Sequence, residues 1–292
     1  KYSNVGEANP MKSIDLLKYH KRQQLLNDYY YHLMDFSTNL NFGCVVIGDS
    51  MHVFRGHFGE MECAENNRYL HDLNQSETIN SKEFHFCCIK LAPNNNRSNT
   101  SQACLGDNSG RLLFYDFLRG EYLNEVYKSN KCRISVIDWK NDYNAYNGVI
   151  AAGSLDKSIR IYDDRALRKH SLKLKYHRGE VCGLKWNANN EHLLLSGGNQ
   201  NIVCCWDLRK KSKPLFVGKH RAAIRALTWY PNPNGTDSDN MFVSGGGSND
   251  QCIKIWNINE CGAGNAGNQR PKRRHKELYS LATGSQVCNL NY

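Results

Sequence analysis

The sequence predicts an all-β fold, a β-propeller assembled from repeated small sheets. The main observation is a segment that recurs along the chain, and its clearest copy is HRGEVCGLKWNANNEHLLLSGGNQNIVCCWDLR, residues 177–209. This copy contains a histidine, a strand ending at Trp186, a second strand ending in Ser-Gly-Gly, a tight turn, and a third strand closing on Trp206-Asp207. One such unit is too small to bury its own apolar face, so repeats of this kind stack on their neighbours.

The spacing of the copies matches the length of a propeller blade. The residues that end the first strand are 48, 47 and 43 positions apart, and the aromatic residues that end the third strand are 47, 44 and 50 positions apart. A blade of the WD-repeat type takes roughly 40–45 residues. The first-strand markers are Leu91, Trp139, Trp186 and Trp229, and the third-strand markers are Tyr115, Tyr162, Trp206 and Trp256. The sequence therefore predicts a WD-repeat β-propeller with about five blades and the start of a sixth.

The order of elements follows from the repeats. We expect an N-terminal linker segment over residues 1–26 and the propeller over residues 27–292. The first unit is the faintest, with strands around Phe36 and up to Phe54. In the clearer units apolar and polar residues alternate, as in Val181 to Trp186, which is typical of half-buried strands. Polar stretches interrupt the repeats and are expected to be solvated loops. They cover residues 94–99, 231–240 and 262–276.

Composition narrows the class of protein. The 38 Lys and Arg residues exceed the 28 Asp and Glu residues, giving a formal charge of +10 that favours acidic partners. No run of about 18 apolar residues occurs, so we expect no membrane partner. The 12 cysteines include several inside strand patterns, where cysteine behaves as a small hydrophobe, and no CxxC pair provides zinc-ligand spacing. We therefore expect neither a metal ion nor another cofactor.

Signals that suggest chemistry have simpler explanations. The string GAGNAG, residues 262–267, has the form GxGxxG but runs into the basic residues 270–276 (RPKRRHK) without a helix to hold a pyrophosphate. His177 and His220 precede first strands at a fixed position, so we expect them to hydrogen-bond within a blade. For His220 the expected partners are Ser244, Asp250 and Trp256. In the blade of His177, Gln200 stands where Asp is usual, and we expect that network to be incomplete. No nucleophile is spaced to use either histidine, so we expect no enzymatic activity.

Six strings occurring in order exceed the general repeat and together resemble the Fizzy family, the WD-repeat activators of the anaphase-promoting complex. They are NDYYYHLMDFS (27–37), EVCGLKWN (180–187), SGGNQN (196–201), HRAAIRALTW (220–229), SGGGSND (244–250) and GSQVCNL (284–290). The resemblance covers residues 11–292. It implies a seven-bladed propeller that is not an enzyme. Such a protein captures KEN-box and destruction-box degrons and delivers the proteins that carry them to the ubiquitin ligase for cell-cycle degradation.

The resemblance also implies site residues and partners. Asp28 would face the arginine of a destruction box, while Asn199, Asn201, Ser248 and Gln286 would contact a KEN tripeptide. The implied partners are subunits of the anaphase-promoting complex and degron-bearing substrates such as cyclins, with checkpoint inhibitors as a further class. The implied location is the nucleus and cytoplasm.

Blade geometry, independently of the resemblance, places the same four residues on one face. The turn between strands two and three, and the loop leading into the next blade, open on the same face, which places Asn199, Asn201, Ser248 and Gln286 on one rim. Amides and hydroxyls can donate to a carboxylate and accept from an ammonium group. The alternative for each asparagine is turn chemistry alone, since Asn tolerates left-handed geometry.

Two other functions stay open at this point. One is a general WD-repeat scaffold for protein–protein interaction without degron binding. The other, which we rank lower, is a nucleic-acid or anionic-lipid surface formed by the basic stretch Arg270 to Lys276.

The chain departs from the family pattern in several ways. Gln200 replaces the usual Asp, and Ser248 the usual Thr. The sequence lacks most of a sixth blade, a seventh blade and both docking segments of the family. We therefore expect an open ring with two exposed sheet edges, which favours association.

Overall fold

The computed structural model describes residues 31–37, 42–48, 50–55, 85–93, 102–117, 119–128, 132–141, 148–163, 170–210, 213–230, 240–259 and 277–290. The regular elements within these ranges are β-strands. No helix in this described part has the length and apolar character needed to cross a bilayer. The expected linker over residues 1–26, Asp28 and the basic stretch 270–276 lie outside the described residues.

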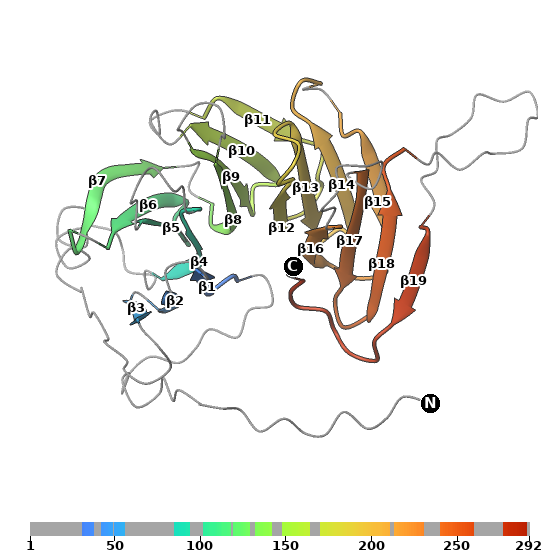
Figure 1. The fold of residues 1–292 in the computed structure, drawn as a ribbon, viewed down its shortest axis with the longest axis horizontal. Helices are drawn as coiled ribbons and strands as arrows, with labels where there is room; N and C mark the ends of the chain where they lie inside the picture. The colour runs from blue at the N-terminus through green and yellow to red at the C-terminus, as the bar shows by residue number, and fades with distance from the viewer. Residues whose placement is uncertain are drawn as a thin grey trace, which may run out of the picture.

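The described strands form antiparallel sheets in chain order (Figure 1). The first sheet has three strands and each of the four that follow has four strands, paired in the order of the sequence. The first sheet contains β1 (Met34–Ser37), β2 (Phe42–Ile47) and β3 (Ser50–Arg55), and the second contains β4 (Phe86–Leu91), β5 (Gln102–Asp107), β6 (Arg111–Asp116) and β7 (Glu121–Lys128). The third sheet contains β8 (Ile134–Asn141), β9 (Gly148–Ser154), β10 (Ser158–Asp163) and β11 (Leu172–Lys175), and the fourth contains β12 (Val181–Trp186), β13 (Leu193–Gly198), β14 (Ile202–Asp207) and β15 (Phe216–Lys219). The fifth sheet contains β16 (Ile224–Trp229), β17 (Met241–Gly246), β18 (Cys252–Asn257) and β19 (Tyr279–Ala282).

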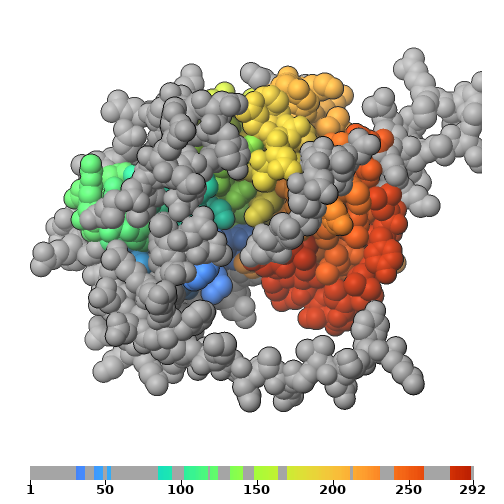
Figure 2. Space-filling view, viewed as in Figure 1, coloured from blue at the N-terminus to red at the C-terminus, as the bar shows by residue number. Residues whose placement is uncertain are grey.

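The first strand of each sheet lies toward the middle of the molecule. Strands β4, β8, β12 and β16 pack against one another in succession, and the sheets fan outward from them (Figure 1). After β19 the chain returns to the middle, where the Val287 amide donates to the Gly246 carbonyl at 3.0 Å. This arrangement confirms the predicted all-β, partial propeller. Figure 2 shows the last sheet, coloured orange to red, on the side of the molecule opposite the green strands of the second sheet.

Aromatic and aliphatic residues fill the space between neighbouring sheets. Between the fourth and fifth sheets, Phe216 meets Phe242 edge-on at 5.3 Å and Trp256 at 5.6 Å between ring centroids. Several cysteines join this core, as their strand positions predict: Cys44, Cys88, Cys182, Cys204 and Cys205 are buried. Burial raises the pKa of the Cys204 thiol, so it remains a neutral apolar group.

The fifth sheet contains the hydrogen-bonded histidine network that the sequence predicts. His220 Nδ1 lies 2.6 Å from the Asp250 carboxylate and its Nε2 lies 2.7 Å from the Ser244 hydroxyl. The indole N–H of Trp256 donates to the same hydroxyl at 2.7 Å. Because these groups are buried, their mutual bonds replace the bonds to water that folding removes.

The equivalent network of the fourth sheet corrects one expectation. His177 Nε2 is 2.7 Å from the Ser196 hydroxyl, to which Trp206 Nε1 donates at 2.8 Å. We expected the network to be incomplete because Gln200 replaces Asp, but the Gln200 amide reaches His177 Nδ1 at 2.5 Å. The Gln200 side chain is long enough for its amide to contact His177 in place of the usual Asp carboxylate. Its Oε1 atom is buried with no hydrogen-bond partner among the described residues, so the substitution is not equivalent to Asp.

Charged side chains connect the inner strands across a central cavity of about 280 Å³. The Asp35 carboxylate accepts from the Leu91 amide at 2.9 Å, and the Asp138 carboxylate accepts from the Trp186 amide at 2.7 Å. Lys90 lies between the two carboxylates, 3.2 Å from Asp35 and 3.9 Å from Asp138. Each carboxylate therefore satisfies a backbone donor on a neighbouring sheet and helps to fix the spacing of the inner strands.

Candidate functional site

One hydrogen bond recurs at the turn between the second and third strands of each four-stranded sheet. In every case the first residue of the turn donates its backbone N–H to the carbonyl of the residue just before the inner strand. All these turns therefore open on the same face, beside the ends of the inner strands. The bonds run from Asn108 to His85, Leu155 to Arg133, Asn199 to Glu180 and Gly247 to Ala223, with N···O distances of 3.1, 3.1, 2.9 and 2.9 Å.

Asn199 is the exposed first residue of the β13–β14 turn. Its side chain lies directly over Gly179, so that a Cβ atom at position 179 would overlap Asn199 Oδ1. The side-chain amide therefore occupies space that a glycine leaves open, in the loop that leads into β12, the inner strand of the same sheet.

Asn201, at the end of the same turn, adopts a left-handed backbone conformation with φ of 67°. Its carbonyl accepts from the His220 amide at 2.9 Å, and its Nδ2 donates to the Arg221 carbonyl at 3.1 Å. Stabilising the turn, which was the alternative role considered for this asparagine, is therefore part of what Asn201 does. This bond uses one of the two N–H groups of Nδ2, and Asn201 Oδ1 is the side-chain atom that can accept from a ligand.

The next turn of the rim is joined to the first through Arg221. Its backbone N–H donates to the Asp250 carboxylate at 2.7 Å, while its carbonyl accepts from Asn201. Ser248 is exposed in the turn that contains Asp250. Gln286 is exposed immediately before Val287, whose amide bonds to Gly246 at the end of β17, directly before that same turn. The structure therefore brings Asn199, Asn201, Ser248 and Gln286 together along one continuous rim, and their binding role stays a prediction.

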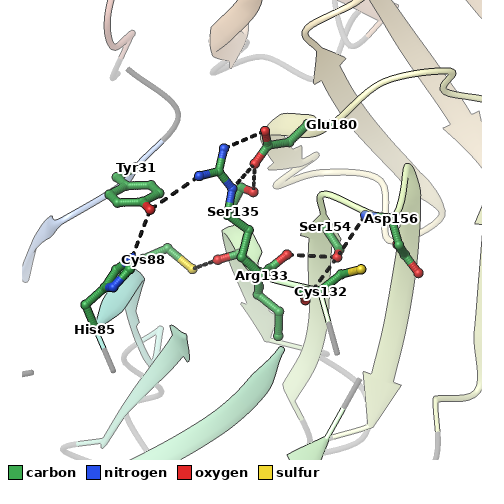
Figure 3. Close-up of polar contacts among 10 residues, drawn as sticks. Tyr31, His85, Cys88, Cys132, Arg133, Ser135, Ser154, Asp156 and Glu180 are labelled. Carbon is green, nitrogen blue, oxygen red and sulfur yellow. Dashed lines mark hydrogen bonds and ion pairs between the residues drawn. The ribbon is translucent and has the colours of Figure 1, made fainter. Parts of the chain in front are cut away.

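A second polar network on this face was not predicted (Figure 3). The Arg133 guanidinium donates to both oxygens of Glu180, each at 2.7 Å, and also to the Tyr31 hydroxyl at 3.3 Å. The Tyr31 hydroxyl lies 3.0 Å from His85 Nε2, and Ser135 donates to Glu180. These partners belong to segments that lead into four different sheets, so no local spacing reveals the network. The available signal is that His85, Arg133 and Glu180 occupy the same position of successive repeats, directly before the inner strand.

Burial and an ion pair determine the electrostatics of this network. Burial raises the pKa of Tyr31 to about 12, and the nearby Cys87 adds to the effect, so the hydroxyl keeps its proton. Glu180 is 2% exposed and its charge is matched by the two bonds from Arg133, the arrangement that makes a buried carboxylate tolerable. Within the described ranges, no group of three His, Cys, Asp or Glu side chains could hold a metal ion.

Comparison with known proteins agrees with the architecture. The family model "WD domain, G-beta repeat" matches residues 168–207, which contain β11 to β14, and residues 212–257, which contain β15 to β18. A chain in a crystal structure of the mitotic checkpoint complex superposes with a TM-score of 0.69 and 25% identity, covering 91% of this chain and 69% of that chain.

Curated relatives are similar in sequence over a larger part of the chain than the family model matches. FIZZY-RELATED 1 of Arabidopsis thaliana is 29% identical over 91% of this chain and 46% of its own length. The APC/C activator protein CDH1 of Saccharomyces cerevisiae is 30% identical over 65% of this chain and 29% of its own length. The chain thus spans less than half the length of these relatives. The resemblance to the Fizzy family that the ordered motifs predict is confirmed, and it extends over about nine-tenths of the chain.

Proposed function

We propose that this protein is a substrate-recognition activator of the anaphase-promoting complex that binds KEN-box and destruction-box degrons. The observation that carries the proposal is the continuous rim of Asn199, Asn201, Ser248 and Gln286 on one face of the propeller. The names of the relatives, which include Fizzy-related proteins and an activator of this complex, support the same role.

The chemistry of the rim suits a short polar peptide. Asn199 and Gln286 each offer an exposed amide that can donate to a carboxylate or accept from an ammonium group, and Ser248 offers a hydroxyl with the same two capacities. Asn201 contributes Oδ1 as an acceptor. A peptide carrying Lys, Glu and Asn side chains presents the complementary set. Asp28, three residues before Tyr31 in the chain, is proposed to receive the arginine of a destruction box.

The proposed activity is binding and delivery, not catalysis. The proposed partners are subunits of the anaphase-promoting complex, degron-bearing substrates such as cyclins, and checkpoint inhibitors. The proposed place of action is the nucleus and cytoplasm. A checkpoint partner has support of its own, since the solved structure described above is that of a mitotic checkpoint complex.

Peptide binding tests the proposal directly. Fluorescein-labelled KEN and destruction-box peptides are titrated with the purified protein and with a variant combining Asn199→Ala and Asn201→Gly. Glycine at position 201 keeps the left-handed backbone while removing the amide. We expect KEN affinity to fall by at least about tenfold, the loss of one or two hydrogen bonds, with destruction-box binding unchanged.

The matched control is Leu155→Ala, because Leu155 is the exposed first residue of the equivalent turn in the third sheet and its backbone N–H bonds to Arg133 as that of Asn199 bonds to Glu180. We expect this control to bind both peptides normally. If the double variant binds the KEN peptide as well as the unmodified protein does, the assignment of the rim is wrong.

A further inference from the structure

We infer that Gly179 and the Arg133–Glu180 ion pair are positioning residues, which set the location of Asn199 on the peptide-binding rim. This inference rests on the proposed function and adds to it residues that do not themselves contact the ligand. It begins from two features of Asn199: its backbone N–H bonds to Glu180, and its side chain lies over Gly179.

The backbone of the Asn199 turn is anchored on a residue that is itself clamped. The Glu180 carbonyl receives the Asn199 amide at 2.9 Å. The Glu180 side chain is held by two charge-assisted bonds from Arg133, each 2.7 Å long, and by the Ser135 hydroxyl. A side-on, two-bond pair between guanidinium and carboxylate fixes direction as well as distance. The ion pair, which Figure 3 shows, therefore restricts movement of Glu180, and the Asn199 turn is attached to the carbonyl of this residue.

The next repeat shows that the blade does not need this ion pair in order to fold. In that repeat Ala223 stands at the position of Glu180, and its carbonyl still accepts from the Gly247 amide at 2.9 Å. The turn-to-strand bond thus forms equally well on an alanine. What Glu180 and Arg133 add is a fixed connection between the third and fourth sheets at the base of the Asn199 turn.

The same comparison explains Gly179. Its equivalent in the next repeat is Ala222, and Gly179 is not among the glycines with a left-handed backbone, so the loop conformation accepts a side chain. The conflict is with the ligand-binding residue: a Cβ at position 179 would overlap the Asn199 amide and come within 3.3 Å of Gln200 Oε1. Because Asn199 is at the surface, alanine at 179 would turn its side chain to another rotamer while leaving the fold in place.

The test uses Gly179→Ala and Arg133→Lys in the purified protein. Gly179→Ala is expected to weaken KEN-peptide binding about tenfold, the loss of one well-placed hydrogen bond, while destruction-box affinity and the thermal midpoint stay unchanged. Arg133→Lys keeps the charge but loses the two-bond geometry. It is expected to increase the hydrogen-exchange rate of the Asn199 amide and to weaken KEN binding. The matched control is Arg209→Lys, which alters a comparable pair with Asp207 at an exposed arginine.

Each result separates the two claims. If the unmodified protein binds the KEN peptide and both variants bind it equally well, the positioning role is overturned and the proposed function stands. If the Asn199 amide exchanges at the same rate with and without the Arg133 guanidinium, the anchoring step is overturned regardless of any peptide. If the unmodified protein binds neither peptide, the proposed function is rejected, and the role of these residues in recognition is rejected with it.

Discussion

At the scale of single residues, two equivalent histidines have acquired different surroundings. His220 faces the Asp250 carboxylate, whereas His177 faces the neutral Gln200 amide. Burial lowers the pKa of His177 to about 4, and the bond to Gln200 only partly opposes it. Asp250 also accepts from the Arg221 amide, which ties its turn to the loop before β16. The turn that carries Asn199 and Asn201 lacks this carboxylate.

The first prediction restores the carboxylate with Gln200→Asp. A negative charge beside His177 Nδ1 favours the protonated ring, so the pKa of His177 should rise above about 4. The substitution also removes the buried Gln200 Oε1, which has no hydrogen-bond partner among the described residues. We therefore expect the free energy of unfolding to increase by about 1 kcal/mol. NMR titration of the imidazole and urea denaturation at pH 7 measure the two effects. A lower stability together with an unchanged pKa would contradict this account.

The second prediction concerns acid sensitivity. Burial lowers the pKa of His177 to about 4 and that of His32 to about 3, from 6.5 for each. Between the unfolded and folded values only the unfolded chain binds the proton, so stability falls as the pH decreases from about 6.5 toward 4. Each histidine contributes a slope of up to about 1.4 kcal/mol per pH unit.

Denaturation at pH 7.0 and pH 5.5, a window above the titration of most carboxylates, measures this slope. His177→Gln should reduce the slope. The same change at His192, whose side chain is 39% exposed, serves as the control and should leave it unaltered. Equal slopes for the unmodified protein and His177→Gln would argue against the assignment.

At the scale of elements, glycines allow the sheets to approach one another. Gly197 in β13 lies against the backbone of Ile224 in β16, and a Cβ there would overlap the Ile224 carbonyl oxygen. Gly245 in β17 instead leaves room for the Val287 side chain, which an added Cβ would overlap. The second strand of the fourth sheet can therefore pack directly on the backbone that begins the fifth, and the second strand of the fifth sheet holds the returning C-terminal segment through Val287.

The third prediction compares Gly197→Ala with Gly284→Ala. The first places a methyl group into rigid backbone, and we expect it to lower the free energy of unfolding by more than about 3 kcal/mol, the upper range for overpacking. Gly284 has φ of 72°, and a Cβ atom added there would meet no other atom within 4 Å, so only left-handed strain of about 1–2 kcal/mol is expected. Guanidinium denaturation of both variants ranks them, and the reverse order would refute the packing argument.

The elements themselves could largely be predicted from the sequence, because period and alternation are local. Leu91, Trp186 and Trp229 end β4, β12 and β16 as expected. Blade geometry also predicted that Asn199 and Gln286 lie on one rim, and their binding role stays a prediction. The Arg133–Glu180 pair could not be predicted, since its partners are 47 residues apart and meet only when two sheets stack. Nor could the compensation by Gln200, which depends on how far one side chain reaches within a particular turn.

At the scale of the whole molecule, apolar side chains are exposed at both ends of the described series of sheets. Met34 and Phe36 in β1 are 74% and 62% exposed, and Tyr279 and Leu281 in β19 are 57% and 49% exposed. Strand β19 is paired only with β18 among the described strands. An apolar strand at a sheet edge is a site for association with another chain.

The fourth prediction is that the 292-residue chain self-associates, and that Tyr279→Lys with Leu281→Lys reduces the association. The two side chains lie on one face of β19, and charge on an edge strand opposes edge-to-edge pairing. Sedimentation velocity at several protein concentrations measures the effect. The control is Leu215→Lys, which adds charge at an exposed apolar residue just before β15 of the fourth sheet, outside the edge strand β19, and should leave the association unchanged. A monodisperse monomer with a cooperative melt would contradict the prediction.

The double role of Arg221 has a mechanical consequence. Its carbonyl is bound by the turn before it and its amide by the turn after it, so the fourth and fifth sheets share one residue at the rim. A ligand that pulls on either turn therefore strains the other through the backbone of a single residue, and the two turns respond to load as one unit.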